Sequence, residues 1–96
     1  MGKKEAYQEK VQAQLREWKA DIEKLMARAD KAKAEGKIEF YKRAETLNAK
    51  YQAALKSSQE MKEAGEDKWE EFKAGVEAAL EEVKDALKKN GASKPQ

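Results

Sequence analysis

The sequence predicts an all-α protein, an antiparallel coiled coil in a single domain, and three observations support this prediction. Charged residues make up 42% of the chain and hydrophobic residues 40%, with one Pro and five Gly, a composition typical of long helices. Apolar residues recur at alternating steps of four and three, the spacing of a coiled-coil seam. A segment with its own helix-start signals and apolar stripe follows residue 65. Disorder is the competing interpretation of so polar a chain, and the periodicity argues against it.

The first helical segment begins near residue 4 and carries one apolar seam. The alternating spacing places the seam residues on one side of a helix. They are Val11, Leu15, Trp18, Ile22, Leu25, Ala29 and Ala32, here called the N-terminal seam. Trp18 is expected to pack in a core rather than to bind a ligand, because aromatic side chains bury the most apolar surface.

A second seam of the same kind follows, out of phase with the first. Its residues are Phe40, Ala44, Leu47, Tyr51, Ala54, Ser58 and Met61, and the step from Ala32 to Phe40 is eight residues rather than seven. Gly36 lies in this gap, where it either kinks a continuous helix or closes a turn. Glycine within a helix costs only about 1 kcal/mol relative to alanine, and no Pro or Asn occurs between residues 31 and 39. We therefore expect one long helix over about residues 4–63.

A second helix is predicted over about residues 67–89. Gly65 ends the preceding helix, and Asp67 followed by Glu70 resembles a capping box with Asp67 as the N-cap. The apolar stripe of this helix consists of Trp69, Phe72, Val76, Leu80, Val83 and Leu87. Asn90-Gly91 is expected to stop the helix and to end a domain spanning residues 1–91, and residues 92–96 are expected to form a flexible tail.

These segments can pack in two ways. The last helix is expected to fold back along residues 40–61, so that its stripe meets Tyr51, Ala54, Leu55 and Met61. Phe40 and Leu47 are expected to pack within the chain as well. If the long helix is straight, the N-terminal seam stays uncovered, and we expect a homodimer or small homo-oligomer built on it. If Gly36 forms a hairpin instead, all three stripes can close a monomeric three-helix bundle.

The residue types exclude several kinds of chemistry. The chain has no Cys and no His, which removes disulfides, thiolate nucleophiles, the usual zinc sites and imidazole acid–base catalysis. Its adjacent carboxylates, such as Glu70 and Glu71, fit a solvated helix face better than a desolvated catalytic pair. No glycine-rich phosphate loop is present. We therefore predict no catalytic residues, no metal, no cofactor and no enzymatic activity.

Charge and hydropathy limit the class of partner. The formal net charge is +2 and is spread mildly along the chain, so nucleic-acid binding, which requires a basic stripe, is not expected. No apolar stretch is long enough for a signal peptide or a membrane span, and we expect a cytoplasmic location. The last helix is amphipathic, but its polar side is acid-rich, which disfavours membrane-surface binding.

The segment Trp69-Glu70-Glu71-Phe72-Lys73-Ala74-Gly75-Val76 resembles a group of small bacterial coiled-coil domain-containing proteins of unknown function, as do Lys4-Glu5-Ala6-Tyr7 and Lys31-Ala32-Lys33-Ala34. The resemblance covers nearly the whole chain and implies no enzymatic activity. A weaker likeness to apolipoprotein-type amphipathic helices is also present.

The function predicted from the sequence is a non-enzymatic interaction or scaffold protein that self-associates through the N-terminal seam. An unidentified protein is the other partner considered. The alternatives are reversible lipid or membrane-surface binding by amphipathic helices and a stress-type protectant.

Overall fold

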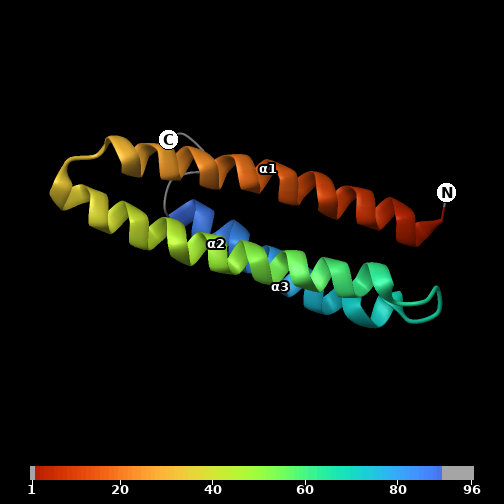
Figure 1. The fold of residues 1–96 in the computed structure, drawn as a ribbon. Coiled ribbons are helices and arrows are strands. Elements are labelled where there is room, and N and C mark those ends of the chain that lie inside the picture. Colours follow the sequence, from red (N-terminus) through yellow and green to blue (C-terminus); the bar gives the residue numbers. More distant parts are fainter. Residues whose placement is uncertain (1, 90–96) are drawn as a thin grey trace.

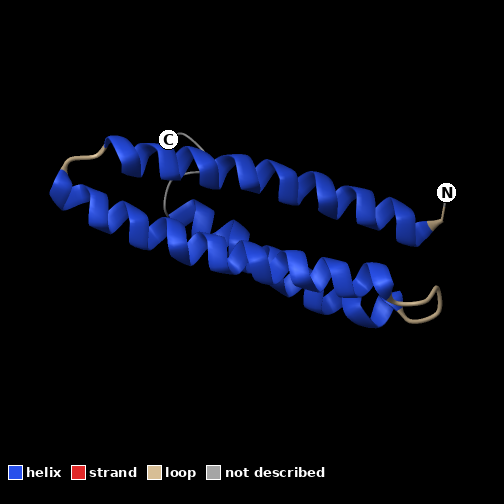
Figure 2. Cartoon of the chain, viewed as in Figure 1, coloured by secondary structure: helices blue, strands red, loops and turns tan. Residues whose placement is uncertain are grey.

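The computed structural model describes residues 2–89, which form three helices and no strand (Figures 1 and 2). They are α1 (Lys3–Lys31), α2 (Ala34–Glu63) and α3 (Trp69–Lys89). Helix α2 runs antiparallel to both neighbours and makes the main contacts with each of them. The all-α class and the folding back of the last helix are confirmed. The single helix over residues 4–63 is wrong, and the alternative three-helix bundle is observed.

The chain reverses at Ala32 and Lys33, three residues before Gly36. Both residues are extended, with φ and ψ of −72° and 155° for Ala32 and −68° and 159° for Lys33. Gly36 is the third residue of α2, and its φ lies outside the left-handed region. The expectation that Gly36 makes the kink or turn is therefore wrong, because two ordinary residues in extended conformation suffice.

The phase difference between the two seams explains why the chain turns. Each residue rotates an α-helix by about 100°, so one extra residue between Ala32 and Phe40 would rotate the second seam by about that angle relative to the first. One straight partner could not cover both seams of such a helix. When the chain reverses, the two seams lie on separate helices and can face each other between α1 and α2.

One apolar core runs between the helices. Its buried hydrophobic side chains come from all three helices at the predicted seam positions, and Leu47, Met61, Val76, Val83 and Leu87 have no exposed surface. Ala44 and Ala54 are also buried, where small side chains let the helices approach. Such burial is worth about 1.5–3 kcal/mol for each large apolar side chain.

The second connection differs in detail from the prediction. Helix α2 ends at Glu63, and α3 begins at Trp69, two residues beyond Asp67. The N–H groups of Lys68 and Trp69 both donate to the Gly65 carbonyl, so the backbone itself closes this turn. The capping box at Asp67 is therefore wrong. The predicted stop at Asn90-Gly91, the end of the 1–91 domain and the tail at 92–96 lie outside the described residues.

The substitution Lys33→Pro tests the turn. Proline fixes φ near −65°, which Lys33 already adopts, and it favours an extended preceding residue, as Ala32 is. We expect the free energy of unfolding to rise by about 0.4–1 kcal/mol, because the unfolded chain loses freedom. Lys42→Pro, inside α2, is the matched control and should lower it by about 3 kcal/mol or more. Urea denaturation measures both. Equal destabilisation by the two prolines would mean that residue 33 is helical.

Candidate interaction surfaces

The N-terminal seam forms the α1 side of the protein's own core. All of its members are buried except Ala32, which is half-buried in the turn. They pack against α2, which returns alongside them. The premise that this seam lies uncovered is therefore wrong, although self-association itself stays a prediction.

The residues expected to pack within the chain mostly do so, and the exceptions are Phe72 and Leu55, which is 40% exposed and lies beside α1 rather than α3. Leu47, Tyr51, Met61, Trp69, Val76, Val83 and Leu87 are buried, and Phe40 and Leu80 are half-buried. Phe72 is 39% exposed, whereas Lys73 is half-buried. The steps of four and three from Trp69 pass through residue 73 rather than 72. The heptad spacing therefore identifies the inward position better than side-chain hydrophobicity does.

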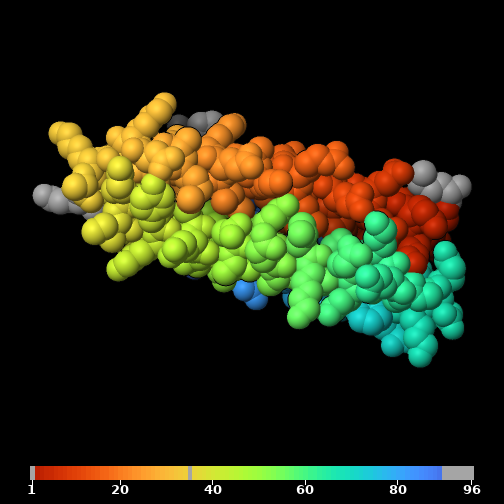
Figure 3. All heavy atoms as spheres, in the orientation of Figure 1, coloured from red at the N-terminus to blue at the C-terminus, as the bar shows by residue number. Residues whose placement is uncertain are grey.

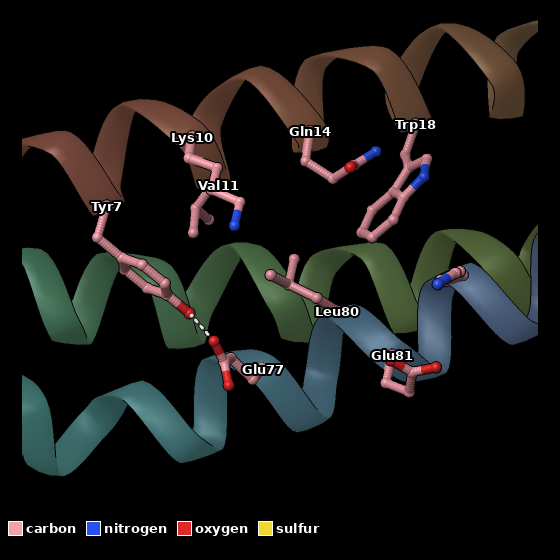
Figure 4. Close-up of a pocket in the computed structure, with 9 residues that line it drawn as sticks. Tyr7, Lys10, Val11, Gln14, Trp18, Glu77, Leu80 and Glu81 are labelled. Carbon is pink, nitrogen blue, oxygen red and sulfur yellow. Dashed lines mark hydrogen bonds between the residues drawn. The ribbon is translucent and has the colours of Figure 1, made fainter.

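A hollow lies between α1 and α3, the two helices that contact each other least (Figure 4). Its volume is about 330 Å³. Val11, Trp18 and Leu80 line its apolar part, and charged side chains of both signs stand around them: Lys10, Glu77, Glu81 and Lys84. Their close mixture of charges favours no single class of ligand.

Tyr7 closes one end of this hollow and ties α1 to α3. Its hydroxyl donates to Glu77 Oε2 over 3.0 Å, and its ring centroid lies 5.9 Å from that of Trp69 (Figure 4). Lys73 Nζ stands 5.0 Å from the centroid of the Tyr7 ring, within cation–π range. Burial, followed by the hydrogen bond and the charge of Glu77, raises the pKa of Tyr7 to about 12. Tyr7 was not among the predicted seam residues, although it precedes Val11 by one helical turn.

A second tie fixes the same end of α1 to α2. Lys4 Nζ donates to the carbonyl oxygen of Ala64 over 2.6 Å. Ala64 is the C-cap of α2, where carbonyl groups lack partners within the helix and the helix dipole favours a cation. Together with Tyr7, this contact holds the beginning of α1 against both other helices.

The outer side of α1 and α2, turned away from α3, is here called the α1–α2 face. On each helix its residues follow at steps of three and four and therefore share one side. They are Gln12, Arg16, Lys19, Glu23, Met26 and Asp30 from α1, and Ile38, Tyr41, Glu45, Asn48, Gln52 and Leu55 from α2. Figure 3 shows α1 and α2 side by side along this side, with α3 largely hidden behind them.

Exposed apolar groups gather on this face. Four large hydrophobic side chains are exposed among residues 2–89, and three of them, Met26 (39%), Ile38 (63%) and Leu55 (40%), belong to the α1–α2 face. Met26 and Leu55 each line a hollow on this face. One, of about 290 Å³, is lined by Ile22, Met26, Ala44 and Tyr51 among others, and the next is lined by Leu15, Tyr51 and Leu55. Tyr51 borders both hollows, so the apolar strip continues between them.

A hydrogen bond joins the two edges of this face near the Ala32–Lys33 turn. The Tyr41 hydroxyl donates to Asp30 Oδ1, and this bond is the main reason that the pKa of Tyr41 is raised. Farther along, the side chains at the edges are mostly polar and exposed. The face thus has an apolar centre with a polar rim, which is the usual anatomy of a protein interface.

A metal site and a membrane span are both absent from the part of the chain that the structure describes. Among the described side chains, which do not include that of Glu35, no group of three or more Asp or Glu residues is arranged to hold a metal ion. Within that range, no helix combines the length and the apolar character needed to cross a bilayer. Apart from Phe72, the stripe of α3 faces the core, so it gives no specific support to the lipid-binding alternative.

Searches against protein-family models, curated proteins and solved structures find no significant match to this chain. The resemblance to small bacterial coiled-coil proteins stays a prediction. The assignment of a function therefore depends on the geometry and chemistry of the surfaces described above.

The pKa of Tyr7 predicts how the α1–α3 tie depends on pH. Because the folded-state pKa is about 12 against the usual 10.0, folding disfavours the phenolate. The stabilisation from this group is intact below pH 10 and is lost as the pH rises from 10 towards 12. We expect the free energy of unfolding of the wild-type protein to fall faster over this interval than that of Tyr7→Phe. Urea denaturation at a series of pH values measures the difference. Parallel curves for the two proteins would contradict the prediction.

Proposed function

We propose that this protein is a non-catalytic interaction module that self-associates as a homodimer through the α1–α2 face. One observation carries the proposal: three of the four exposed large hydrophobic side chains among residues 2–89 lie on that face, and two of them, Met26 and Leu55, each line a hollow there. Single exposed apolar residues need no explanation, but a group of them with a polar rim is typical of a binding surface.

The size of the face supports a second copy as the occupant. The Cα atoms extend over 51 × 20 × 18 Å, so one long side offers roughly 1,000 Å², compared with about 800 Å² per partner in a standard protein interface. The α1 edge carries Arg16 and Lys19 as well as Glu23 and Asp30. A rim with both signs can complement itself, whereas a partner of one strong charge would meet repulsion along half of it.

The N-terminal seam is not the proposed interface. Its side chains already contact α2 in a single chain, so a change such as Ile22→Asp would unfold the monomer and would not report on assembly. The homodimer is the one predicted from the sequence, but its interface is the outer side of α1 and α2 rather than the N-terminal seam.

The substitution Met26→Asp tests the proposal. Burial of one apolar side chain is worth about 1.5–3 kcal/mol, and a symmetric dimer contains Met26 twice, so we expect the Kd of the dimer to rise at least about tenfold. Phe72→Asp is the matched control, because Phe72 is equally exposed but lies on α3. Sedimentation equilibrium measures the Kd, and circular dichroism checks that each variant keeps its helices.

Two results would contradict the proposal. One is a wild-type protein that sediments as a monomer at every concentration up to the millimolar range. The other is a dimer that Phe72→Asp weakens as much as Met26→Asp, because the α1–α2 face would then have no special role.

A further inference from the structure

The charges along the α1 edge of the α1–α2 face are sorted by sign. Arg16 and Lys19 come first, and Glu23 and Asp30 follow at the later positions of the same edge. The α2 edge supplies one charge, Glu45, among six positions. The orientation of a partner on this face is therefore governed mainly by α1.

We infer that a second copy docks with its α1 antiparallel to the first α1, about a two-fold axis level with the midpoint between Lys19 and Glu23. This inference rests on the proposed dimer through the α1–α2 face. The axis places Lys19 of each copy opposite Glu23 of the other, so one pair of residues forms two identical ion pairs. The same axis places Arg16 of each copy opposite Met26 of the other, whose charged neighbours along the edge are Glu23 and Asp30.

The apolar groups support the same axis independently. Met26 lies on one side of the midpoint, beside the hollow that Lys19 and Glu23 line. Leu55 lies on the other side, because it shares a hollow with Arg16. The two-fold axis exchanges these two levels and brings Met26 of one copy next to Leu55 of the other. The arrangement that satisfies the charges thus also covers the exposed apolar side chains.

The alternative two-fold arrangement, with α1 of one copy over α2 of the other at the same level, fits poorly. Glu23 and Glu45 line the same hollow, and the Asp30–Tyr41 hydrogen bond places Glu45 level with Met26, one helical turn from Glu23. That arrangement would bring Glu23 of one copy within about one turn of Glu45 of the other, and like charges this near are unfavourable. It would also keep Met26 and Leu55 at separate levels.

Charge reversal tests the antiparallel arrangement. In a homodimer of Lys19→Glu, the new glutamate at residue 19 of each copy lies opposite Glu23 of the other, so both pairs carry like charges. In a homodimer of Glu23→Lys, the new lysine at residue 23 of each copy lies opposite Lys19 of the other, with the same result. We expect either variant alone to raise the Kd of the dimer about three- to tenfold. An equimolar mixture of the two variants restores opposite charges in both pairs, so a heterodimer should form with a Kd close to that of the wild type. Sedimentation equilibrium and native mass spectrometry measure these species.

The mixture separates contacts between chains from contacts within one helix. Lys19 and Glu23 are also one turn apart on α1, where they can pair locally. Both variants break that local pair, and mixing does not repair it, so recovery can come only from contacts between chains. Glu81→Lys and Lys84→Glu, on the α1–α3 side, are the matched controls and should leave the Kd unchanged singly and mixed.

The outcomes distinguish this inference from the proposed dimer. A dimer that Met26→Asp weakens but neither charge reversal affects would keep the α1–α2 face and overturn the antiparallel arrangement. Weakening by both reversals without recovery in the mixture would also overturn it. A wild-type monomer at all concentrations would overturn the proposed dimer and the arrangement together.

Discussion

The out-of-phase seams are the constraint on which the rest of this structure depends. The extra residue between Ala32 and Phe40 rotates the second apolar stripe by about 100° in any continuous helix. A long helix would then need two partners on two sides, whereas a reversal at Ala32–Lys33 lets the stripes cover each other. The reversal loses the helical hydrogen bonds across two residues and gains the burial of most of both seams.

The reversal also makes α2 the central element of the bundle. Helices α1 and α3 each pack along α2, while the contact between them depends on Tyr7 and its neighbours at one end. A chain of 96 residues buries only a modest fraction of its accessible surface when it folds. This arrangement leaves the outer side of α1 and α2 uncovered. The apolar groups on that side are exposed because three helices leave room for a further layer there.

Periodicity predicted which residues would be buried better than it predicted where helices end. Every member of the N-terminal seam except Ala32 is buried, because heptad spacing reports the side of a helix directly. A continuous helix was expected, with a turn at Gly36 as the alternative because glycine is the usual signal, yet the chain turns at Ala32 and Lys33, whose extended angles are open to any residue. Phe72 was predicted to face the core because it is hydrophobic, although the heptad spacing places residue 73 rather than residue 72 on the inward side of α3. The α1–α2 face was not predicted, because it is defined only after the two helices pair.

The same geometry links the stability of α1 to its assembly. Helix α1 is held mainly by one interface with α2, so a second layer on the α1–α2 face would contact α1 on another side. Any ligand that binds only the folded chain stabilises it by an amount that grows with the logarithm of its concentration above the Kd, and a second copy acts in this way as concentration rises. A dimer formed on this face would therefore add a second interface to α1. Residues of α1 would contribute to the core with the N-terminal seam and to assembly with the α1–α2 face.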